Sequence, residues 1–229
     1  MKTGSEIIID VLAEEGVETI FGYSGGAILP TYDEVFKYNE ANPKNPMPLI
    51  VPSNEQGAGF MASGYARSTG KPGVVMVTSG PGATNTVTPV RDAMADSIPM
   101  VIICGQVSRA AIGSDAFQEA PISSVMGSVA KHVFLITNEN KLAATLKAAF
   151  EVARSGRPGP VVVDIPKDIQ TAEISDEDHE EANIAAYANR ILAIEESRLS
   201  EEKSSEFFDH LSNSKKPLIY FGGGVISAN

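Results

Sequence analysis

The chain has 229 residues, of which 43% are hydrophobic and 21% charged, and its formal net charge is −11. This balance is ordinary for a globular protein, and the acidity argues against nucleic acid or an anionic membrane as the main partner. The longest apolar runs fall far short of the roughly 20 residues that cross a bilayer. Glu6 and Asp10 interrupt the N-terminal apolar stretch, so we expect no signal peptide and a cytoplasmic location.

From the N-terminus, the spacing of apolar residues predicts alternating helices and strands. The predicted helices span residues 5–15, 27–38, 56–67, 83–95 and 139–154. The predicted strands span residues 17–21, 49–51, 73–78, 99–104 and 161–165. Most of these strands show no polar alternation, which is typical of a parallel sheet covered by helices. We therefore predict an α/β fold, an open and mostly parallel sheet with helices on both faces. Cys104 lies in an apolar strand and is expected to be a core residue.

The character of the chain changes after residue 172. Residues 1–172 hold 13 basic and 17 acidic residues, whereas residues 173–229 hold five and 12. We interpret residues 173–214 as an acidic linker, partly helical from 184 to 211. Residues 217–224 have the pattern of a strand followed by three glycines. Residues 215–229 are therefore expected to be the truncated beginning of a second α/β domain.

Loops at the carboxyl ends of parallel strands are where such sheets bind ligands. The loop at 79–85 invites a dinucleotide interpretation, but it lacks the last glycine of G-x-G-x-x-G and carries Pro81, so a tight turn is the alternative. Glu55 stands just before a helix in an otherwise uncharged loop. A glutamate there can simply interact with the helix dipole, or it can supply a functional carboxyl group. No cluster of His, Cys and Asp has the spacing of metal ligands.

Several segments, taken together and in order, resemble a known family. FGYSGGAILP at 21–30, NEQGAG at 54–59, GYAR at 64–67 and TSGPGATN at 78–85 resemble the pyrimidine-binding domain of thiamine-diphosphate enzymes. GSDAFQE at 113–119, KH at 131–132, SGRPGP at 155–160 and DIPKDIQ at 164–170 resemble the acetolactate synthase large subunit in particular. The sequence departs from that family at Ser24, Asn54, Pro89 and Arg91.

The resemblance implies roles for six residues. Glu55 would bond to N1′ of the aminopyrimidine and favour the imino tautomer that removes the C2 proton. Gly25 would leave room at the reaction centre. Phe117, Gln118 and Lys167 would line the substrate channel, with a surface loop and a solvated lysine as the alternatives. Arg157 would contact FAD, with a helix-end arginine as the alternative.

The activity that the resemblance implies is decarboxylation of pyruvate and transfer of the hydroxyethyl carbanion to a second 2-ketoacid, in branched-chain amino-acid biosynthesis. FAD would be retained for structure. Mg²⁺ would be held by a Gly-Asp-Gly segment that this sequence lacks, so we expect its ligands in a missing C-terminal part and expect the chain alone to be inactive. The implied partners are further large subunits, in a homodimer or higher oligomer, and a regulatory small subunit.

Two kinds of alternative are left open at this point. One is another thiamine-diphosphate enzyme, either a 2-ketoacid decarboxylase or a sulfoacetaldehyde acetyltransferase. The other is a non-catalytic fragment that binds flavin or dimerises with a full-length subunit.

Overall fold

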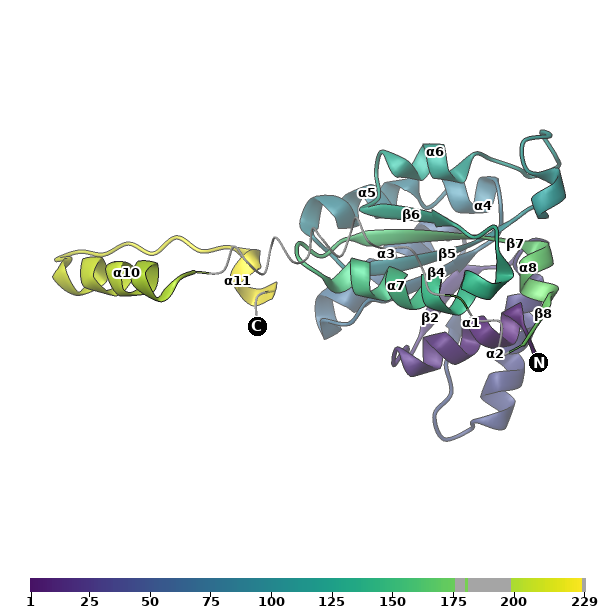
Figure 1. Cartoon of the computed structure of the whole chain (residues 1–229), viewed down its shortest axis with the longest axis horizontal. Helices are drawn as coiled ribbons and strands as arrows, with labels where there is room; N and C mark the ends of the chain where they lie inside the picture. The colour runs from purple at the N-terminus through teal and green to yellow at the C-terminus, as the bar shows by residue number, and fades with distance from the viewer. Residues whose placement is uncertain (176–179, 181–198, 228–229) are drawn as a thin grey trace. The chain divides into compact units, whose positions relative to one another are not determined.

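The computed structural model describes residues 1–175, 180 and 199–227, and the chain divides into two compact units, Met1–Asn183 and Ile184–Asn229. The first unit is built on a six-stranded sheet in the order β3-β2-β4-β5-β7-β6 (Figure 1). Every pair of neighbouring strands in this sheet is parallel. The strands are β2 (Ile20–Tyr23), β3 (Leu49–Ile50), β4 (Gly73–Val77), β5 (Met100–Gln106), β6 (His132–Leu135) and β7 (Pro160–Pro166).

Helices cover both faces of this sheet (Figure 1). One face packs against α1 (Gly4–Glu14), α2 (Leu29–Ala41), α7 (Leu142–Arg154) and α8 (Lys167–Thr171). The other packs against α3 (Glu55–Thr69), α4 (Pro81–Thr84), α5 (Val87–Asp96) and α6 (Ile122–Gly127). The central strands β4, β5 and β7 are buried along their whole length, as their unbroken apolar sequences require. The predicted α/β fold with a mostly parallel sheet is confirmed.

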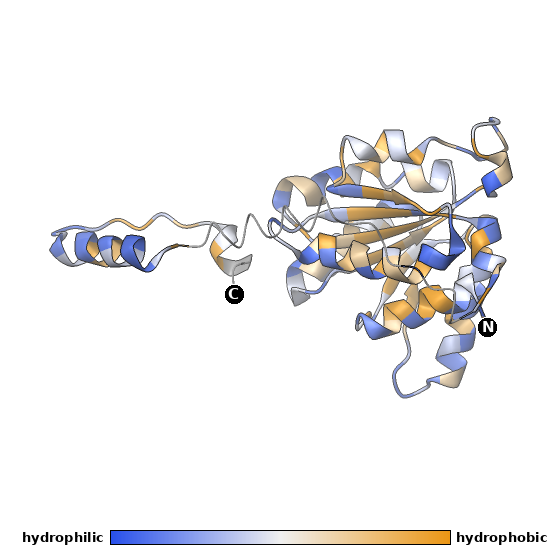
Figure 2. Cartoon of the chain, viewed as in Figure 1, coloured by the Kyte–Doolittle hydropathy of each residue, from blue (hydrophilic) through white to orange (hydrophobic). Residues whose placement is uncertain are grey.

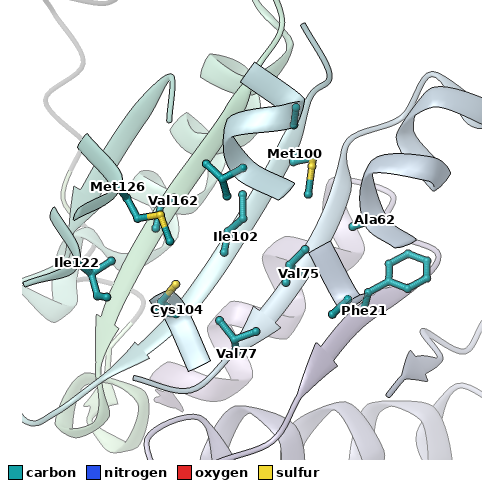
Figure 3. Packing of buried hydrophobic residues seen from close by; sticks show 14 residues of the cluster. Phe21, Ala62, Val75, Val77, Met100, Ile102, Cys104, Ile122, Met126 and Val162 are labelled. Carbon is teal, nitrogen blue, oxygen red and sulfur yellow. The ribbon is translucent and has the colours of Figure 1, made fainter. Parts of the chain in front are cut away.

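The core beneath α3–α6 is a continuous apolar cluster, shown in Figure 3. Ala62 of α3, Ile122 and Met126 of α6, and Ile102 and Val162 of the central strands meet in it. Figure 2 shows the same pattern across the first unit, with hydrophobic residues concentrated on the strands. Cys104 belongs to this cluster, as expected, and burial together with the nearby charge of Asp164 raises the pKa of its thiol.

Some elements differ from the sequence prediction. The helix predicted at 83–95 is two helices, α4 and α5. Strand β6, helix α6 and helix α8 were not predicted, because each is a segment of four to six residues, too short to show a period. Glu173 and Ile174, predicted as the start of the linker, form β8, which pairs with β1 (Lys2–Thr3). The described part of the unit also contains two short 3₁₀ helices, η1 (Arg109–Ala111) and η2 (Glu139–Lys141).

The second unit contains α10 (Glu201–Asn213) and α11 (Gly223–Ser227) in its described part. Helix α10 begins after Ser200, whose side chain accepts a hydrogen bond from the Lys203 backbone N–H. It overlaps the segment 184–211 that was predicted to be partly helical and ends two residues beyond it, and the earlier part of that segment lies outside the described residues. The strand predicted from residue 217 is absent, since residues 217–222 are irregular and the described part of this unit offers no strand for pairing. No described helix has both the length and the apolar character that a bilayer crossing requires.

Candidate functional site

The candidate site lies along one edge of the sheet. Because the strands are parallel, the loops that follow them all emerge at the carboxyl edge. In spatial order this edge carries Glu55 after β3, Gly25 after β2, residues 79–85 after β4, Gln118 after β5 and Lys167 after β7. Five of the six predicted site residues, counting Phe117 beside Gln118, therefore come from loops of this edge.

Glu55 is the first residue of α3, and the local sequence explains why the helix begins there. Asn54 is its N-cap, and the Asn54 side chain accepts a hydrogen bond of 2.7 Å from the Gly57 backbone N–H. The Glu55 side chain is buried, with 9% of its surface exposed. Its Oε2 accepts a hydrogen bond of 2.9 Å from Nδ2 of Asn85. Among the described residues, no group donates a hydrogen bond to the other oxygen, Oε1.

Two glycines pack against Thr78, and one of them, Gly82, also lies beside the Glu55 carboxyl group. A Cβ atom at Gly82 would lie 3.4 Å from Oε1 of Glu55 and 2.7 Å from Cγ2 of Thr78. A Cβ atom at Gly25 would lie only 2.5 Å from the Thr78 side chain. Thr78 in turn accepts a hydrogen bond from the Ala27 backbone N–H through Oγ1. The close approach of Thr78 thus requires a glycine at position 25, independently of any role that Gly25 has toward a ligand.

Tyr32 of α2 lies close enough to Glu55 for the charge of the carboxylate to affect the pKa of the tyrosine hydroxyl group. Its hydroxyl group donates a hydrogen bond of 2.8 Å to the Met76 carbonyl oxygen, and the ring is buried. Burial, and then the negative charge of Glu55, raise the pKa of Tyr32. Sequence reasoning did not single out Tyr32, because nothing in a helical tyrosine marks the contact that its hydroxyl group makes.

The loop that carries Gln118 packs against the loop that carries Gly82. Gly80 adopts a φ of +54°, and a Cβ atom there would lie 2.3 Å from the Gln118 carbonyl oxygen. This supports the tight-turn interpretation of residues 79–85, because the close approach and the positive φ both require glycine. Gln118 itself has a φ of 59° and is half-buried. Phe117 beside it is 89% exposed.

The other two predicted residues lie apart from Glu55. Lys167 is exposed at the start of α8, on the same edge of the sheet. Arg157 precedes the first residue of β7 and so lies at the opposite, amino edge. Its guanidinium group bonds to Oγ of Ser97 at 2.8 Å and to the Met94 and Ala95 carbonyl oxygens at 2.9 Å. These bonds close the C-terminal end of α5, which favours the helix-end role, while the contact with FAD stays a prediction.

Asn85 is the functional candidate that the sequence interpretation passed over. It stands at the end of the TSGPGATN segment, yet no role was assigned to it. The signal was its position after a glycine-rich turn at the carboxyl end of a strand, where side chains converge on a ligand. Within the described part of the chain, no group of His, Cys, Asp and Glu is arranged to hold a metal ion.

The chain is similar to proteins of known family. Residues 2–127 match the family described as thiamine pyrophosphate enzyme, N-terminal TPP binding domain. The chain is 42% identical over 226 residues to the mitochondrial acetolactate synthase catalytic subunit of Saccharomyces cerevisiae, with 98% of this chain and 32% of that protein covered. It is 43% identical to the acetolactate synthase large subunit of Corynebacterium glutamicum, covering 99% of this chain and 34% of that protein. Identity to the chloroplastic acetolactate synthase of Arabidopsis thaliana is 40%, over 100% of this chain and 32% of that protein. The chain thus spans about a third of the length of these curated relatives.

Proposed function

We propose a function for this chain, which belongs to the thiamine pyrophosphate enzyme family and contains the N-terminal TPP binding domain of that family. The first unit binds the aminopyrimidine ring of thiamine diphosphate at the carboxyl edge of its sheet. It serves acetolactate synthesis, in which pyruvate is decarboxylated and the remaining two-carbon unit is transferred to a second 2-ketoacid.

The observation that carries this proposal is the arrangement of the Glu55 carboxyl group. Oε2 is held by Asn85, and Oε1 has no partner among the described residues and lies beside Gly82. A buried carboxyl group with one oxygen fixed and the other available suits a hydrogen bond to a ring nitrogen. When bound, thiamine diphosphate would supply the nucleophilic carbon of the reaction. Glu55 would hold the ring through N1′ and could exchange a proton with it there, and the burial of most of the Glu55 residue limits access of water to the carboxyl group.

The substrate side of the proposal rests on the loops after β5 and β7. The ammonium group of Lys167 is exposed and attracts the carboxylate groups of ketoacids. Phe117 presents an exposed ring for the apolar part of a substrate, and the amide of the neighbouring Gln118 would serve the polar part. The similarity to acetolactate synthases from fungi, bacteria and plants supports pyruvate as the first substrate.

Further features follow from the same similarity and form part of the proposal. They are a place in branched-chain amino-acid biosynthesis, Mg²⁺ on the cofactor diphosphate, FAD near Arg157 in a role without redox change, and assembly with further large subunits and a regulatory subunit. We propose a cytoplasmic location on the single buried cysteine, whereas the yeast and Arabidopsis relatives are named mitochondrial and chloroplastic.

A chimera tests the proposal directly. This chain would replace the matching third of the Corynebacterium glutamicum large subunit, and acetolactate formed from pyruvate would be measured colorimetrically after cofactor binding has been verified. We expect a chimera that turns over and that loses activity in Glu55→Gln. The matched control is Gly26→Ala, because a Cβ atom at Gly26 would meet nothing within 4 Å. A folded chimera that binds the cofactor and makes no acetolactate would refute the proposal.

A further inference from the structure

Asp164 is a buried acid that neither the packing of the sheet nor the proposed reaction explains. It lies on β7 and is 2% exposed. In the sheet it pairs with Cys104 of β5 on one side and Leu135 of β6 on the other. Alternate residues of a strand face the same side, so Asp164 points to the face of Val162, into the apolar cluster of Figure 3. A carboxyl group buried in an apolar cluster lowers stability unless hydrogen bonds compensate for its loss of water. Its presence there therefore calls for an explanation.

The partners of Asp164 reveal a connection to the site. Its Oδ2 accepts a hydrogen bond of 2.9 Å from Nε2 of Gln106, the last residue of β5. The same Nε2 donates to the Ala120 carbonyl oxygen at 3.3 Å, and Oε1 of Gln106 accepts from the Val107 backbone N–H at 2.8 Å. Val107 and Ala120 stand at the two ends of one segment, residues 107–121. The Gln106 amide therefore joins the two ends of this segment, and Asp164 holds the amide in place. We call this set of hydrogen bonds among Asp164, Gln106, Val107 and Ala120 the clip.

The orientation of the Gln106 amide is set by its other partners. A backbone N–H group only donates, so Val107 must face the amide oxygen, and a carbonyl oxygen only accepts, so Ala120 must face the amide nitrogen. The group that remains for Asp164 is the same nitrogen, which requires an acceptor oxygen on Asp164. The second oxygen, Oδ1, is buried and has no hydrogen-bond partner among the described residues.

The clipped segment is the one that carries Phe117 and Gln118. Its backbone at Gln118 contacts Gly80, in the loop that also supplies Asn85 to Glu55. The segment has a second anchor, since Arg109 pairs with Asp168 and with Glu139. That anchor is partly exposed, and exposed ion pairs contribute little to stability. The buried clip at Gln106 is therefore the stronger determinant of where the segment begins and ends.

We propose that Asp164 is a positioning residue that holds the Gln106 amide, so that residues 107–121 keep Phe117 and Gln118 at the carboxyl edge of the sheet. That Phe117 and Gln118 then meet the substrate rests on the proposed function, whereas the hydrogen bonds of the clip do not depend on it. Burial favours the uncharged form and raises the pKa of Asp164 to about 7, while the hydrogen bond from Gln106 acts in the opposite direction. An ionised Asp164 would be a charge with a single hydrogen bond inside an apolar cluster, and that state is relieved if the base of the segment opens to water.

Within the described part of the chain, the elements packed around Asp164 bring no cation that would offset its charge. On the adjacent strands, Cys104 is the titratable group that shares its face, and His132 pairs with Val161 and so faces the other side. Helices α4 and α6 contain no ionisable residue. The charged side chains of the remaining helices on this face are bound elsewhere or exposed, namely Glu55, Arg67, Arg91, Asp92 and Asp96.

Hydrogen exchange measured by NMR on the 229-residue chain tests the clip without any need for activity. The reporters are the amide protons of Val107, which donates to Gln106, and Glu119, which donates to the Ala116 carbonyl oxygen. Asp164→Asn keeps an acceptor oxygen for Gln106, whereas Asp164→Ala removes it. Val163→Ala is the matched control, because it opens a cavity on the same strand but on the opposite face.

At pH 6 we expect exchange in Asp164→Asn to stay within about twofold of the native chain, and Val107 exchange in Asp164→Ala to be at least about tenfold faster than in Val163→Ala. Equal exchange in Asp164→Ala and Val163→Ala would overturn the proposal.

Should Asp164→Ala fail to fold, the exchange rates of the native chain and of Asp164→Asn are compared between pH 6 and 8.5, after correction for intrinsic exchange. We expect Val107 protection to fall in the native chain alone, and an equal response in both proteins overturns the proposal. Neither outcome depends on acetolactate formation, so failure of the clip and failure of the proposed function are distinguishable.

Discussion

The Asn85 side-chain amide donates a 2.9 Å hydrogen bond to Oε2 of Glu55, although the two residues are 30 positions apart and follow different strands. Asn85 is exposed and Glu55 is buried, so the asparagine reaches from the surface to hold one oxygen of an enclosed carboxyl group. The bond leaves Oε1 beside Gly82 as the oxygen that is available to a ligand.

Removal of this bond should affect catalysis more than stability. In the chimera, Asn85→Ala is expected to lower kcat about tenfold, because the Glu55 carboxyl group loses the contact that orients it. The cost in unfolding free energy should stay near 1 kcal/mol, since Asn85 is exposed. Steady-state kinetics and urea denaturation measure the two effects. A kcat within twofold of the unmodified chimera, with equal cofactor binding, would show that Asn85 does not orient Glu55.

Adjacent glycines give a matched pair for the packing of the loop after β2. Gly25→Ala places a Cβ atom 2.5 Å from the Thr78 side chain, so one of the two must move, and we expect a loss of about 1–3 kcal/mol. Gly26→Ala meets nothing within 4 Å and should change stability by less than about 0.5 kcal/mol. Urea denaturation of the 229-residue chain compares them, and equal stabilities would contradict the packing role assigned to Thr78.

Much of the first unit could be predicted because its central strands are chemically uniform. β4, β5 and β7 are unbroken apolar runs, and only a sheet covered on both faces buries such runs. β6 escaped prediction because it is a four-residue strand at the edge of the sheet, half-buried and beginning with His132. The strand predicted from residue 217 has the right composition but no neighbouring strand among the described residues to pair with.

The site was predictable as a set of loops but not as a set of contacts. The position of Glu55 after β3 and before α3 follows from the local pattern, and so does its place at the carboxyl edge. Its bond to Asn85 depends on the order of the strands, which places the loop after β4 near the loop after β3 without adjacency in the sequence. The clip from Asp164 through Gln106 to Ala120 likewise joins three separate segments. No local pattern encodes such contacts.

Asp164 should also leave a signature in the pH dependence of stability. Burial raises its pKa from the ordinary value of 3.8 to about 7 in the folded chain, so between those pH values the folded state holds a proton that the unfolded state has released. Stability is therefore lost as pH rises from about 4 to about 7, by up to ~4 kcal/mol, and the loss is complete above pH 7. Asp164→Asn does not titrate and lacks this loss.

Urea denaturation of Asp164→Asn and of the native chain at several pH values gives the difference between their unfolding free energies. We expect this difference to move in favour of Asp164→Asn by a few kcal/mol between pH 4.5 and pH 8. Other ionisable groups are the same in both proteins, so their contributions cancel. A difference that does not vary with pH would show that Asp164 is already ionised at low pH.

The central claim, that Glu55 is the acid–base group of a pyrimidine-binding site, is tested most directly by the exchange rate of the C2 proton of thiamine diphosphate bound to the chimera. The rate is measured by acid quench and NMR in the unmodified chimera and in Glu55→Gln, with Gly26→Ala as the control. Glutamine has nearly the same shape but cannot exchange a proton with N1′, so we predict a rate at least about 100-fold lower in Glu55→Gln and unchanged in the control. Equal exchange rates in Glu55→Gln and the unmodified chimera, with cofactor bound to both, would contradict the claim.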